Sequence, residues 1–538
     1  MIRQVIRIAL IAAVIAGGAA IIHGMFQVHP LLYRGSLYYW KAKLAEPWAK
    51  EITVDPAIWS RISYITSPRS QVSTYEVIKH TEPYYHKCYN EGIRHLKRGG
   101  VAAAGTVLMA LGFFLVRGGL SHKKEHLSGR RVMPARRVAW LLKLKRQASD
   151  VRLGGLPLVK GTETQHLLVT GGTGSGKTNC FHHLIPQIEK RGDRMIILDV
   201  TGSMVERYYR PGDALLNPMD PRGLSWHPWA EGQDALDFAS ISEGFIPVSH
   251  SEHENYWRTA ARALMSALLE ECQDQKATSE LYRLALKDPL ADLCRAVQHT
   301  DAGAFLDIQS EKMAGSVRSV AASFLRCLKY VEDTGSPFSI REWVADSSQG
   351  QRLFICCRPS ERAALAPLLS CWFSIAVRSL LHLDPSFDRR IWYIVDELPT
   401  LNKVKELETF VAEGRKYGGC GLFALQSPSQ LEAIYGQQGA QTLMGNCATR
   451  IVFFETDPTV ASSLAKVFGE QEIREYQEGI SYGAHQMRDG VSLSRTSRYQ
   501  PSVSPSDIQA LASHECYVRL PGNFPIAKVV VPLSTSRI

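Results

Sequence analysis

The chain has 538 residues, which is too long for a single hydrophobic core and predicts roughly two to four domains. Hydrophobic residues make up 45% of the chain and charged residues 21%, a composition that excludes a largely disordered protein. The formal net charge of +10 points to an anionic partner, which is either nucleic acid or anionic lipid.

Two apolar runs near the N-terminus are candidates for membrane-spanning helices. Residues 8–22 are all apolar or glycine, and with the next few residues the run reaches the roughly 20 residues that span a bilayer. A cleaved signal peptide fits this run equally well. The second run, residues 99–116, carries no charge and favours a hairpin of two helices with both chain ends on one side. We therefore predict transmembrane helices at residues 1–26 and 99–117.

The segments beside these runs indicate the orientation of the hairpin. Residues 118–150 form a basic juxtamembrane linker, so the positive-inside rule places the rest of the chain in the cytoplasm. We also expect this linker to lie against anionic lipid. Residues 27–98 are polar and rich in tyrosine. They are too many for a bare turn and few for an autonomous domain, so we expect either a small extracytoplasmic docking segment or a poorly ordered loop.

After Asp150 the sequence alternates between strand and helix patterns. Short, nearly continuous apolar runs are typical of strands in a parallel sheet that is covered on both faces. Helical patterns alternate with these runs, so we predict an α/β fold with a doubly wound, mainly parallel sheet. The predicted strands are residues 167–170, 195–199, 353–356, 391–395, 422–425 and 451–454.

One part of this region lacks strand patterns. Between Ser203 and Ser348 we find no convincing strand, but helical patterns occur at residues 256–272, 280–286 and 311–330. A crossover in a sheet is normally one helix long, so this segment predicts an inserted all-α domain. We place the all-α domain at residues 231–345 and the α/β domain at residues 151–230 and 346–538.

The segment that follows the first predicted strand reads GGTGSGKT. Its glycines let backbone N–H groups point inward and form an anion-binding nest at the start of a helix. Lys177 would then reach the β- and γ-phosphates of a nucleotide, and the Thr178 hydroxyl would bind Mg²⁺. A glycine-rich turn that only ends a strand would leave these two side chains unexplained. We therefore predict a site for ATP and Mg²⁺ formed by Gly171, Gly172, Thr173, Gly174, Ser175, Gly176, Lys177 and Thr178.

Two acidic residues, Asp396 and Glu397, directly follow the predicted strand at residues 391–395. They would emerge at the carboxyl end of that strand, where ligands of open α/β sheets bind. Asp396 would hold the Mg²⁺ that Thr178 also contacts, directly or through a water. Glu397 is then placed to polarise a water for attack on the γ-phosphate. An acidic turn is the alternative, but the glycine-rich loop earlier in the same sheet favours the catalytic interpretation.

Two further polar residues are candidates for the same site. Gln426 follows the strand at residues 422–425 and would either contact the γ-phosphate and attacking water, as a sensor of ATP, or cap the end of the strand. Arg415 lies near the end of a predicted helix at residues 402–416. It either balances the helix dipole or reaches the γ-phosphate bound by a neighbouring subunit, and the sequence alone leaves both roles open.

Taken together, these segments resemble the conjugative coupling proteins of type IV secretion systems, the TraD and TrwB family. The resemblance runs from about residue 161 to the end of the chain and includes, besides GGTGSGKT and IVDELPTL, the segments RGDRMIILD, LLNPMDPR, MAGSVRSV, GRKYGGCGLFALQSPSQLEAIYG and PSDIQAL. It implies a RecA-like P-loop ATPase that sits in the bacterial inner membrane and assembles as a homo-hexamer.

The resemblance also bears on single residues. It implies that Lys177 and Thr178 bind phosphate and Mg²⁺, and that Asp396 and Glu397 are the metal-coordinating and catalytic acids. It favours the sensor role for Gln426 and, for Arg415, a finger that acts on the neighbouring subunit. The function that follows is an ATP-driven DNA translocase that delivers DNA, with the single-stranded form favoured, and its covalently attached relaxase to a type IV secretion channel.

The resemblance implies a place in the cell as well. We expect a multi-pass protein of the inner membrane with its ATPase domain in the cytoplasm and with inner-membrane components of the secretion system as partners. Two alternatives remain: a coupling ATPase that chiefly recruits effector proteins, and a membrane scaffold that uses nucleotide as an assembly switch.

Overall fold

A computed structural model of the protein describes residues 2–64, 69–121, 125–249, 251–333, 335–346, 348–481 and 490–534. The chain divides into two compact units. The N-terminal unit comprises residues 1–125 with 474–497, and the sheet unit comprises residues 126–473 with 498–538. Every residue that we predict to bind nucleotide or metal belongs to the sheet unit.

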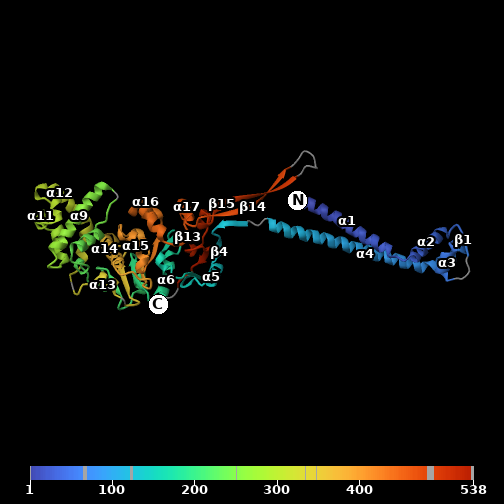
Figure 1. The fold of residues 1–538 in the computed structure, drawn as a ribbon, viewed down its shortest axis with the longest axis horizontal. Coiled ribbons are helices and arrows are strands. Elements are labelled where there is room, and N and C mark those ends of the chain that lie inside the picture. The colour runs from blue at the N-terminus through green and yellow to red at the C-terminus, as the bar shows by residue number, and fades with distance from the viewer. Residues whose placement is uncertain are drawn as a thin grey trace. The chain divides into compact units, whose positions relative to one another are not determined.

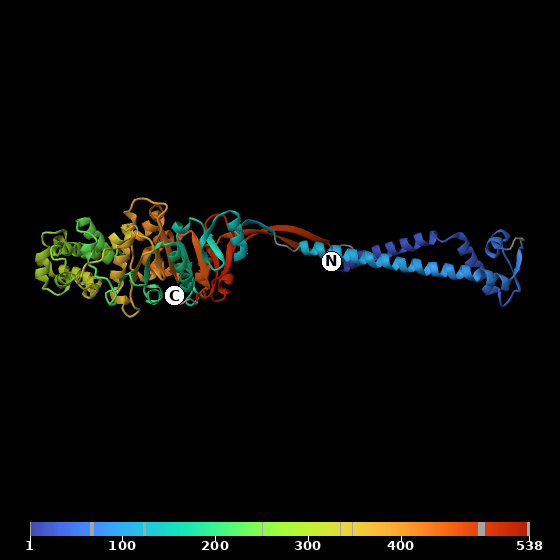
Figure 2. The same ribbon diagram turned by 90° about the horizontal axis from the view of Figure 1, so that it is seen from below.

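Two long helices, α1 (Ile2–Phe26) and α4 (Thr74–Ser121), dominate the N-terminal unit and run side by side in both views (Figures 1 and 2). They approach each other closely at glycines: a Cβ atom on Gly17 would lie 3.2 Å from the carbonyl oxygen of Gly99. Small residues let two apolar helices pack closely in this way.

Between these helices, the described residues of 27–73 form a small folded region that packs on the first part of α4. It contains α2 (Pro30–Ala45), α3 (Pro56–Ser63) and the antiparallel pair β1 (Glu51–Thr53) and β2 (Gln71–Ser73). Trp59 is 2% exposed and lies in a core cluster with Ile52, Ile62 and Val72. The described part of this segment is therefore folded, and its role as an extracytoplasmic docking segment stays a prediction.

Among the described residues, three helices are long and apolar enough to cross a membrane. Two lie in the N-terminal unit, at residues 6–26 of α1 and 74–115 of α4. Only 22% and 6% of the most apolar 18-residue stretch of each helix is buried inside the protein. The third is α14 (Arg362–Leu381), where 72% of the most apolar 18-residue stretch is buried. Its burial identifies α14 as a core helix of the sheet unit.

A 10-stranded sheet organises the sheet unit, in the order β4-β17-β16-β13-β7-β12-β11-β8-β10-β9. All neighbouring pairs from β13 to β9 are parallel, whereas β16 pairs antiparallel with β13 and with β17. This confirms the predicted fold class. The bounds are β4 Val132–Pro134, β7 Leu167–Thr170, β8 Arg194–Asp199, β9 Ala214–Leu216, β10 Arg352–Cys356, β11 Ile391–Val395, β12 Gly419–Leu425, β13 Thr449–Phe453, β16 Glu515–Arg519 and β17 Ile526–Val530.

Alternate residues of the central strands enter two different cores. Leu168, Ile196 and Tyr393 belong to one core cluster, and their neighbours Leu167 and Met195 belong to the other. Because successive side chains of a strand point to opposite faces, a sheet with helices on both faces requires apolar residues at every position. The continuous apolar runs in the sequence have this cause.

The structure corrects the expectation that no strand occurs between Ser203 and Ser348. Strand β9 lies in this interval and pairs parallel with β10, Ala214 opposite Leu353. It is only three residues long, and a run this short shows no recognisable periodicity. The two antiparallel strands β16 and β17 were also not predicted from the sequence.

Helices pack on both faces of the sheet. The first cluster includes residues of α14, α15 and α16, which pack on one face of the sheet, and of α8 and α9, which extend the same core into the helical region; the second cluster includes residues of α5, α6 and α7 on the other face. The bounds are α5 Ala135–Leu144, α6 Lys177–Arg191, α7 Ser203–Tyr208, α8 Ala235–Phe245, α9 Glu252–Glu271, α15 Glu406–Glu413 and α16 Pro428–Asn446. The remaining elements are α17 Pro458–Lys466, α18 Pro505–Gln509, a hairpin of β5 Ala148–Leu153 and β6 Leu156–Val159, and a three-stranded sheet of β15 Gly490–Pro501, β14 Glu470–Ser481 and β3 Glu125–Gly129.

The helices predicted between the strands are confirmed. The pattern at 256–272 corresponds to α9, the pattern at 280–286 to α10 (Thr278–Leu286), and the pattern at 311–330 to α12 (Glu311–Leu325) with the 3₁₀ turn Arg326–Tyr330. With α11 (Leu290–Val297) they lie together at one end of the sheet unit (Figure 1).

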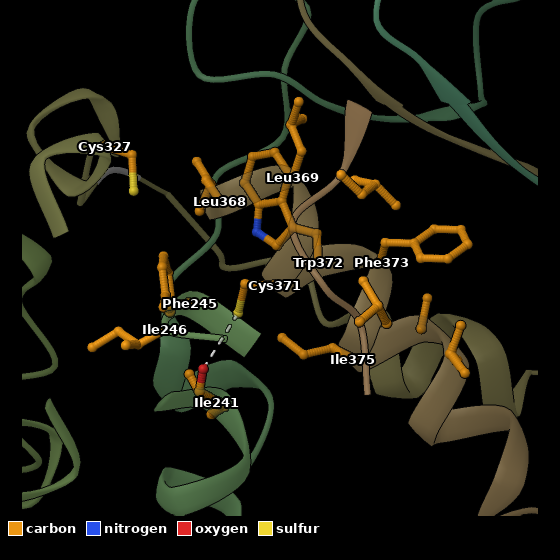
Figure 3. Packing of buried hydrophobic residues seen from close by; sticks show 14 of the residues in the cluster. Ile241, Phe245, Ile246, Cys327, Leu368, Leu369, Cys371, Trp372, Phe373 and Ile375 are labelled. Carbon is orange, nitrogen blue, oxygen red and sulfur yellow. Dashed lines mark hydrogen bonds between the residues drawn. The ribbon is translucent and has the colours of Figure 1, made fainter. Parts of the chain in front are cut away.

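Helix α14 joins this helical region to the sheet. It packs against α8, where the Cys371 thiol lies 3.8 Å from the Ile241 carbonyl oxygen and Phe245 lies nearby (Figure 3). A Cβ atom on Gly244 would lie 3.1 Å from Cys371 Sγ, so the glycine permits the close approach. The helical region and the sheet therefore share one continuous core.

The described part of residues 118–150 is largely folded onto the sheet. Strand β4 pairs with β17, and the α5 residues Val138 and Leu142 are fully buried. Arg130 donates hydrogen bonds to the carbonyl oxygens of Leu520 and Gly522 at 3.1 and 2.7 Å. This arginine thus binds the protein itself, while Lys123 and Lys124 lie outside the described residues.

Candidate nucleotide-binding site

The glycine-rich loop lies between β7 and α6, as the sequence predicts. Gly176 has a φ of 115°, and a Cβ atom there would lie 2.8 Å from Nδ1 of His514. A Cβ atom on Gly171 would lie 2.7 Å from the Cβ of Phe453. The loop is therefore tightly packed at both ends, and only glycine fits at these two positions.

Lys177, the first residue of α6, points back into the loop. Its side chain is largely buried, and Nζ donates hydrogen bonds to the carbonyl oxygens of Gly171 and Gly172 at 2.7 and 2.9 Å. Burial lowers the pKa of Lys177, and the carboxylates of Glu397 and Asp396 oppose this effect. The ammonium group is thus held next to the loop and faces Asp396 and Glu397, which follow β11.

Thr178 and Asp396 meet across the cleft, as the sequence predicts. The Thr178 hydroxyl lies 3.3 and 3.4 Å from the two carboxylate oxygens of Asp396. Burial raises the pKa of Asp396 to about 6, while the Thr178 hydrogen bond and the Lys177 charge lower it. A partly buried carboxylate next to a hydroxyl supplies the hard oxygen ligands that Mg²⁺ prefers, so these residues fit the predicted metal.

Glu397 and Gln426, which line the same cleft, also contact each other. Gln426 hydrogen-bonds Glu397 through its side chain and its backbone, and these bonds oppose the rise in the pKa of Glu397 that burial causes. Gln426 Oε1 also accepts a hydrogen bond from the Thr173 hydroxyl at 3.2 Å. Gln426 therefore connects the candidate catalytic acid to the glycine-rich loop.

These residues line one cleft of about 390 Å³ at the carboxyl edge of the sheet. Its wall also contains residues that the sequence did not indicate: Asn179, Val200, Thr201, Arg362 and His514. Arg362 begins α14 and His514 precedes β16. Neither belongs to a sequence motif, and only the order of the strands brings them to the cleft.

Asp199, at the end of β8, has a structural role beside this cleft. It is 1% exposed, and its carboxylate accepts hydrogen bonds from the backbone N–H groups of Thr201, Gly202, Met204 and Val205. It therefore holds the turn into α7 and, as a nearby charge, contributes to the raised pKa of Asp396.

Arg415 lies outside the cleft. The helix predicted at residues 402–416 is shorter in the structure, because α15 spans only Glu406–Glu413 and a 3₁₀ turn follows at Gly414–Tyr417. Arg415 is exposed in this turn and is not among the residues that line the cleft of its own subunit. A contact with the nucleotide of a neighbouring subunit stays a prediction.

A family model described as the type IV secretion-system coupling protein DNA-binding domain matches residues 150–532. The coupling protein TraD of Escherichia coli strain K12 is 34% identical over 450 residues, which cover 81% of this chain and 63% of TraD. The conjugal transfer protein TraG of Agrobacterium fabrum is 24% identical over 401 residues, which cover 68% of this chain and 59% of TraG. The matched part of this chain thus spans less than two thirds of these relatives.

The chain also resembles solved structures. The bacterial conjugative coupling protein TrwB in its unbound form matches with a TM-score of 0.69 and 29% identity, over 77% of this chain and 95% of the TrwB chain. TrwB in complex with ADP and Mg²⁺ and TrwB with a non-hydrolysable ATP analogue match with a TM-score of 0.68 and 28% identity. The matched family region contains the glycine-rich loop, Asp396, Glu397 and Gln426. The chain therefore belongs to the family of type IV secretion-system coupling proteins.

Proposed function

We propose that this chain is an ATPase that binds ATP and Mg²⁺ in the cleft and couples ATP hydrolysis to the transport of DNA in conjugation. The observation that carries the proposal is the convergence of Lys177, Thr178, Asp396, Glu397 and Gln426 on one cleft of about 390 Å³. The TrwB structures with ADP and Mg²⁺ and with an ATP analogue support the same ligands.

The loop and Lys177 bind the phosphates in this proposal. Backbone N–H groups at the start of α6 attract the phosphate oxygens, and the helix dipole adds to this attraction. In this structure, Lys177 contacts the carbonyl oxygens of Gly171 and Gly172. When nucleotide binds, Lys177 contacts oxygens of the β- and γ-phosphates instead.

Thr178 and Asp396 hold Mg²⁺. These two side chains would supply oxygen ligands to the ion, and the ion would supply positive charge that offsets the charge developing on the phosphates. Asp396 must be ionised to bind it, and the pKa of about 6 allows this at neutral pH.

Glu397 and Gln426 act on the attacking water. Glu397 accepts a hydrogen bond from the water and orients it for attack on the γ-phosphate. Gln426 contacts both Glu397 and Thr173 of the loop. A γ-phosphate in the loop would shift Thr173 and therefore Gln426, so Gln426 reports the presence of ATP to Glu397.

The proposal extends to assembly and location. The exposed position of Arg415, outside its own cleft, supports a homo-hexamer in which Arg415 reaches the γ-phosphate bound by the next subunit. The weakly buried apolar segment of α1 and the uncharged part of α4 that begins at residue 99 support a multi-pass protein of the inner membrane. In that arrangement residues 27–98 lie outside the membrane and the sheet unit lies in the cytoplasm.

The proposed cargo is DNA with its covalently attached relaxase. The net charge of +10 and the match to a family DNA-binding domain support DNA as the ligand. Lys and Arg contacts to phosphates would make this binding sensitive to salt and largely independent of sequence. Inner-membrane components of the secretion system would receive the cargo.

The cleft is tested by ATP binding and hydrolysis of the full-length protein in detergent. Lys177→Ala should abolish ATP binding. Glu397→Gln should retain binding but lower the turnover rate by roughly 10²–10³-fold, because a positioned general base contributes about this much. Glu271→Gln, at an exposed position on α9, is the control and should match the unmodified protein. Equal turnover in Glu397→Gln and the control would reject the role of Glu397.

A further inference from the structure

His514 occupies the side of the glycine-rich loop that lies opposite the acidic residues. In the sheet order β16-β13-β7-β12-β11, the loop follows β7, while Asp396 and Gln426 follow β11 and β12. His514 precedes β16, which runs antiparallel to β13, so His514 reaches the same edge of the sheet from the other side of β7. The cleft thus extends from Asp396 across the loop to His514.

The contacts of His514 show that it is built into the loop. Its backbone N–H donates a hydrogen bond to the carbonyl oxygen of Ser175 at 3.0 Å, and its own carbonyl oxygen accepts one from Val531 N–H at 2.9 Å. Its φ of 66° lies in the left-handed region, which non-glycine residues rarely adopt. Such a conformation, kept at the edge of a ligand cleft, points to a functional constraint on the residue.

The ring of His514 is presented to the cleft. Nδ1 is buried against Gly176 and has no hydrogen-bond partner among the described residues. His514 lines the cleft, and since its backbone N–H and carbonyl groups are both hydrogen-bonded, its ring is the part of the residue left for a ligand. An aromatic surface of this kind can stack on a base or contact a ribose.

The C-terminal segment Val531–Ser534 holds this wall in place. Asn179 on α6 donates a hydrogen bond to the Pro532 carbonyl oxygen at 2.9 Å and accepts one from Ser534 N–H at 3.0 Å. The nitrogen and the oxygen of the Asn179 side-chain amide are therefore both hydrogen-bonded to this segment. Among the cleft residues on this side of the loop, His514 is the one whose side chain is left for a ligand.

On the basis of the proposed function, which directs the γ-phosphate toward Asp396 and Glu397, we infer that the ring of His514 contacts the nucleoside part of the bound nucleotide. The β-phosphate lies in the loop and the γ-phosphate on the β11 side, so the α-phosphate and the nucleoside must leave the loop on the opposite side. His514 lies on that side, next to the first turn of α6. It is a binding residue for ribose or base and takes no part in hydrolysis.

The test separates nucleoside contacts from phosphate contacts in the full-length protein. The variant is His514→Asn, because asparagine tolerates a left-handed conformation but lacks the ring. The dissociation constant of Mg-ATP is measured by equilibrium dialysis. The affinity for Mg-tripolyphosphate, which has no nucleoside, is measured by competition. His382→Asn, at an exposed histidine that ends α14, is the matched control.

His514→Asn should raise the dissociation constant of Mg-ATP by about tenfold, near the lower end of what one base–aromatic contact contributes, and change that of Mg-tripolyphosphate by less than about twofold. An equal loss for both ligands would mean that His514 only supports the loop, and no change for either would mean that it contacts nothing. Either result overturns the inference. Failure of the proposed function is distinct, since Lys177→Ala would then leave both affinities unchanged.

Discussion

At the scale of single residues, Asp396 combines two requirements that oppose each other. Its carboxylate must be ionised to bind Mg²⁺, yet it is largely buried between Thr178 and the end of β8, and burial raises its pKa from an ordinary value of 3.8 to about 6. Between these two values the folded protein binds more protons than the unfolded chain. The contribution of Asp396 to stability therefore falls as pH rises through this range.

Asp396→Asn should consequently stabilise the protein in the absence of Mg²⁺. The gain is at most about 3 kcal/mol at pH 8, given about 1.4 kcal/mol for each unit of pKa shift. It should fall to about half of this near pH 5 and vanish only below the ordinary pKa of 3.8, where the unfolded chain is protonated as well. The same variant should lose Mg-dependent ATP binding. The gain in stability is measured by the apparent midpoint of thermal unfolding at the two pH values, with the exposed Asp274→Asn as control. A variant that is less stable than the unmodified protein at pH 8 would contradict the assigned pKa.

At the scale of elements, α14 connects the cleft to the helical region. It begins at Arg362 in the cleft wall and packs along α8 (Figure 3). The Gly244 contact with Cys371 sets the distance between α8 and α14, because a Cβ atom there would also lie 3.2 Å from the Cα of Cys371. Backbone atoms cannot move aside as a flexible side chain does.

Gly244→Ala should therefore destabilise the protein by roughly 1–3 kcal/mol, the usual cost of an overpacked core. Gly315→Ala is the matched control, because Gly315 lies within α12 and a Cβ atom there would meet nothing within 4 Å. Alanine is the better helix former at such a site by up to about 1 kcal/mol. The two variants should shift the urea midpoint in opposite directions. A shift of the same sign and size in both would show that the α8–α14 contact is not tightly packed.

The elements also show what the sequence could and could not predict. Strand β7 and its loop were predicted because GGTGSGKT joins a buried strand to a helix, and β11 because its apolar run ends in Asp396 and Glu397. Strand β9 is too short to show a pattern, and β16 and β17 gave no signal that was recognised. His514 depends on the antiparallel return of β16 beside β13, a long-range pairing that no local pattern encodes.

At the scale of the whole molecule, the proposed topology makes one cysteine a useful probe. Cys88 is partly exposed and lies in the segment placed outside the membrane, whereas the other cysteines are buried. A membrane-impermeant maleimide should label Cys88 in intact spheroplasts. A cysteine introduced by Lys190→Cys, at an exposed position on α6, should be labelled only after the membrane is permeabilised. Labelling of both positions only after permeabilisation would reject the two-helix topology.

In the proposed function, DNA binding and ATP hydrolysis in the cleft are coupled, and this coupling is measured by the ATPase rate of the full-length protein with and without single-stranded DNA. At low salt, DNA should raise the rate, and the stimulation should weaken as salt rises because phosphate contacts release counterions. Lys177→Ala should remove both the basal and the stimulated rate. The same rate with and without DNA at low salt would contradict a DNA-transporting ATPase.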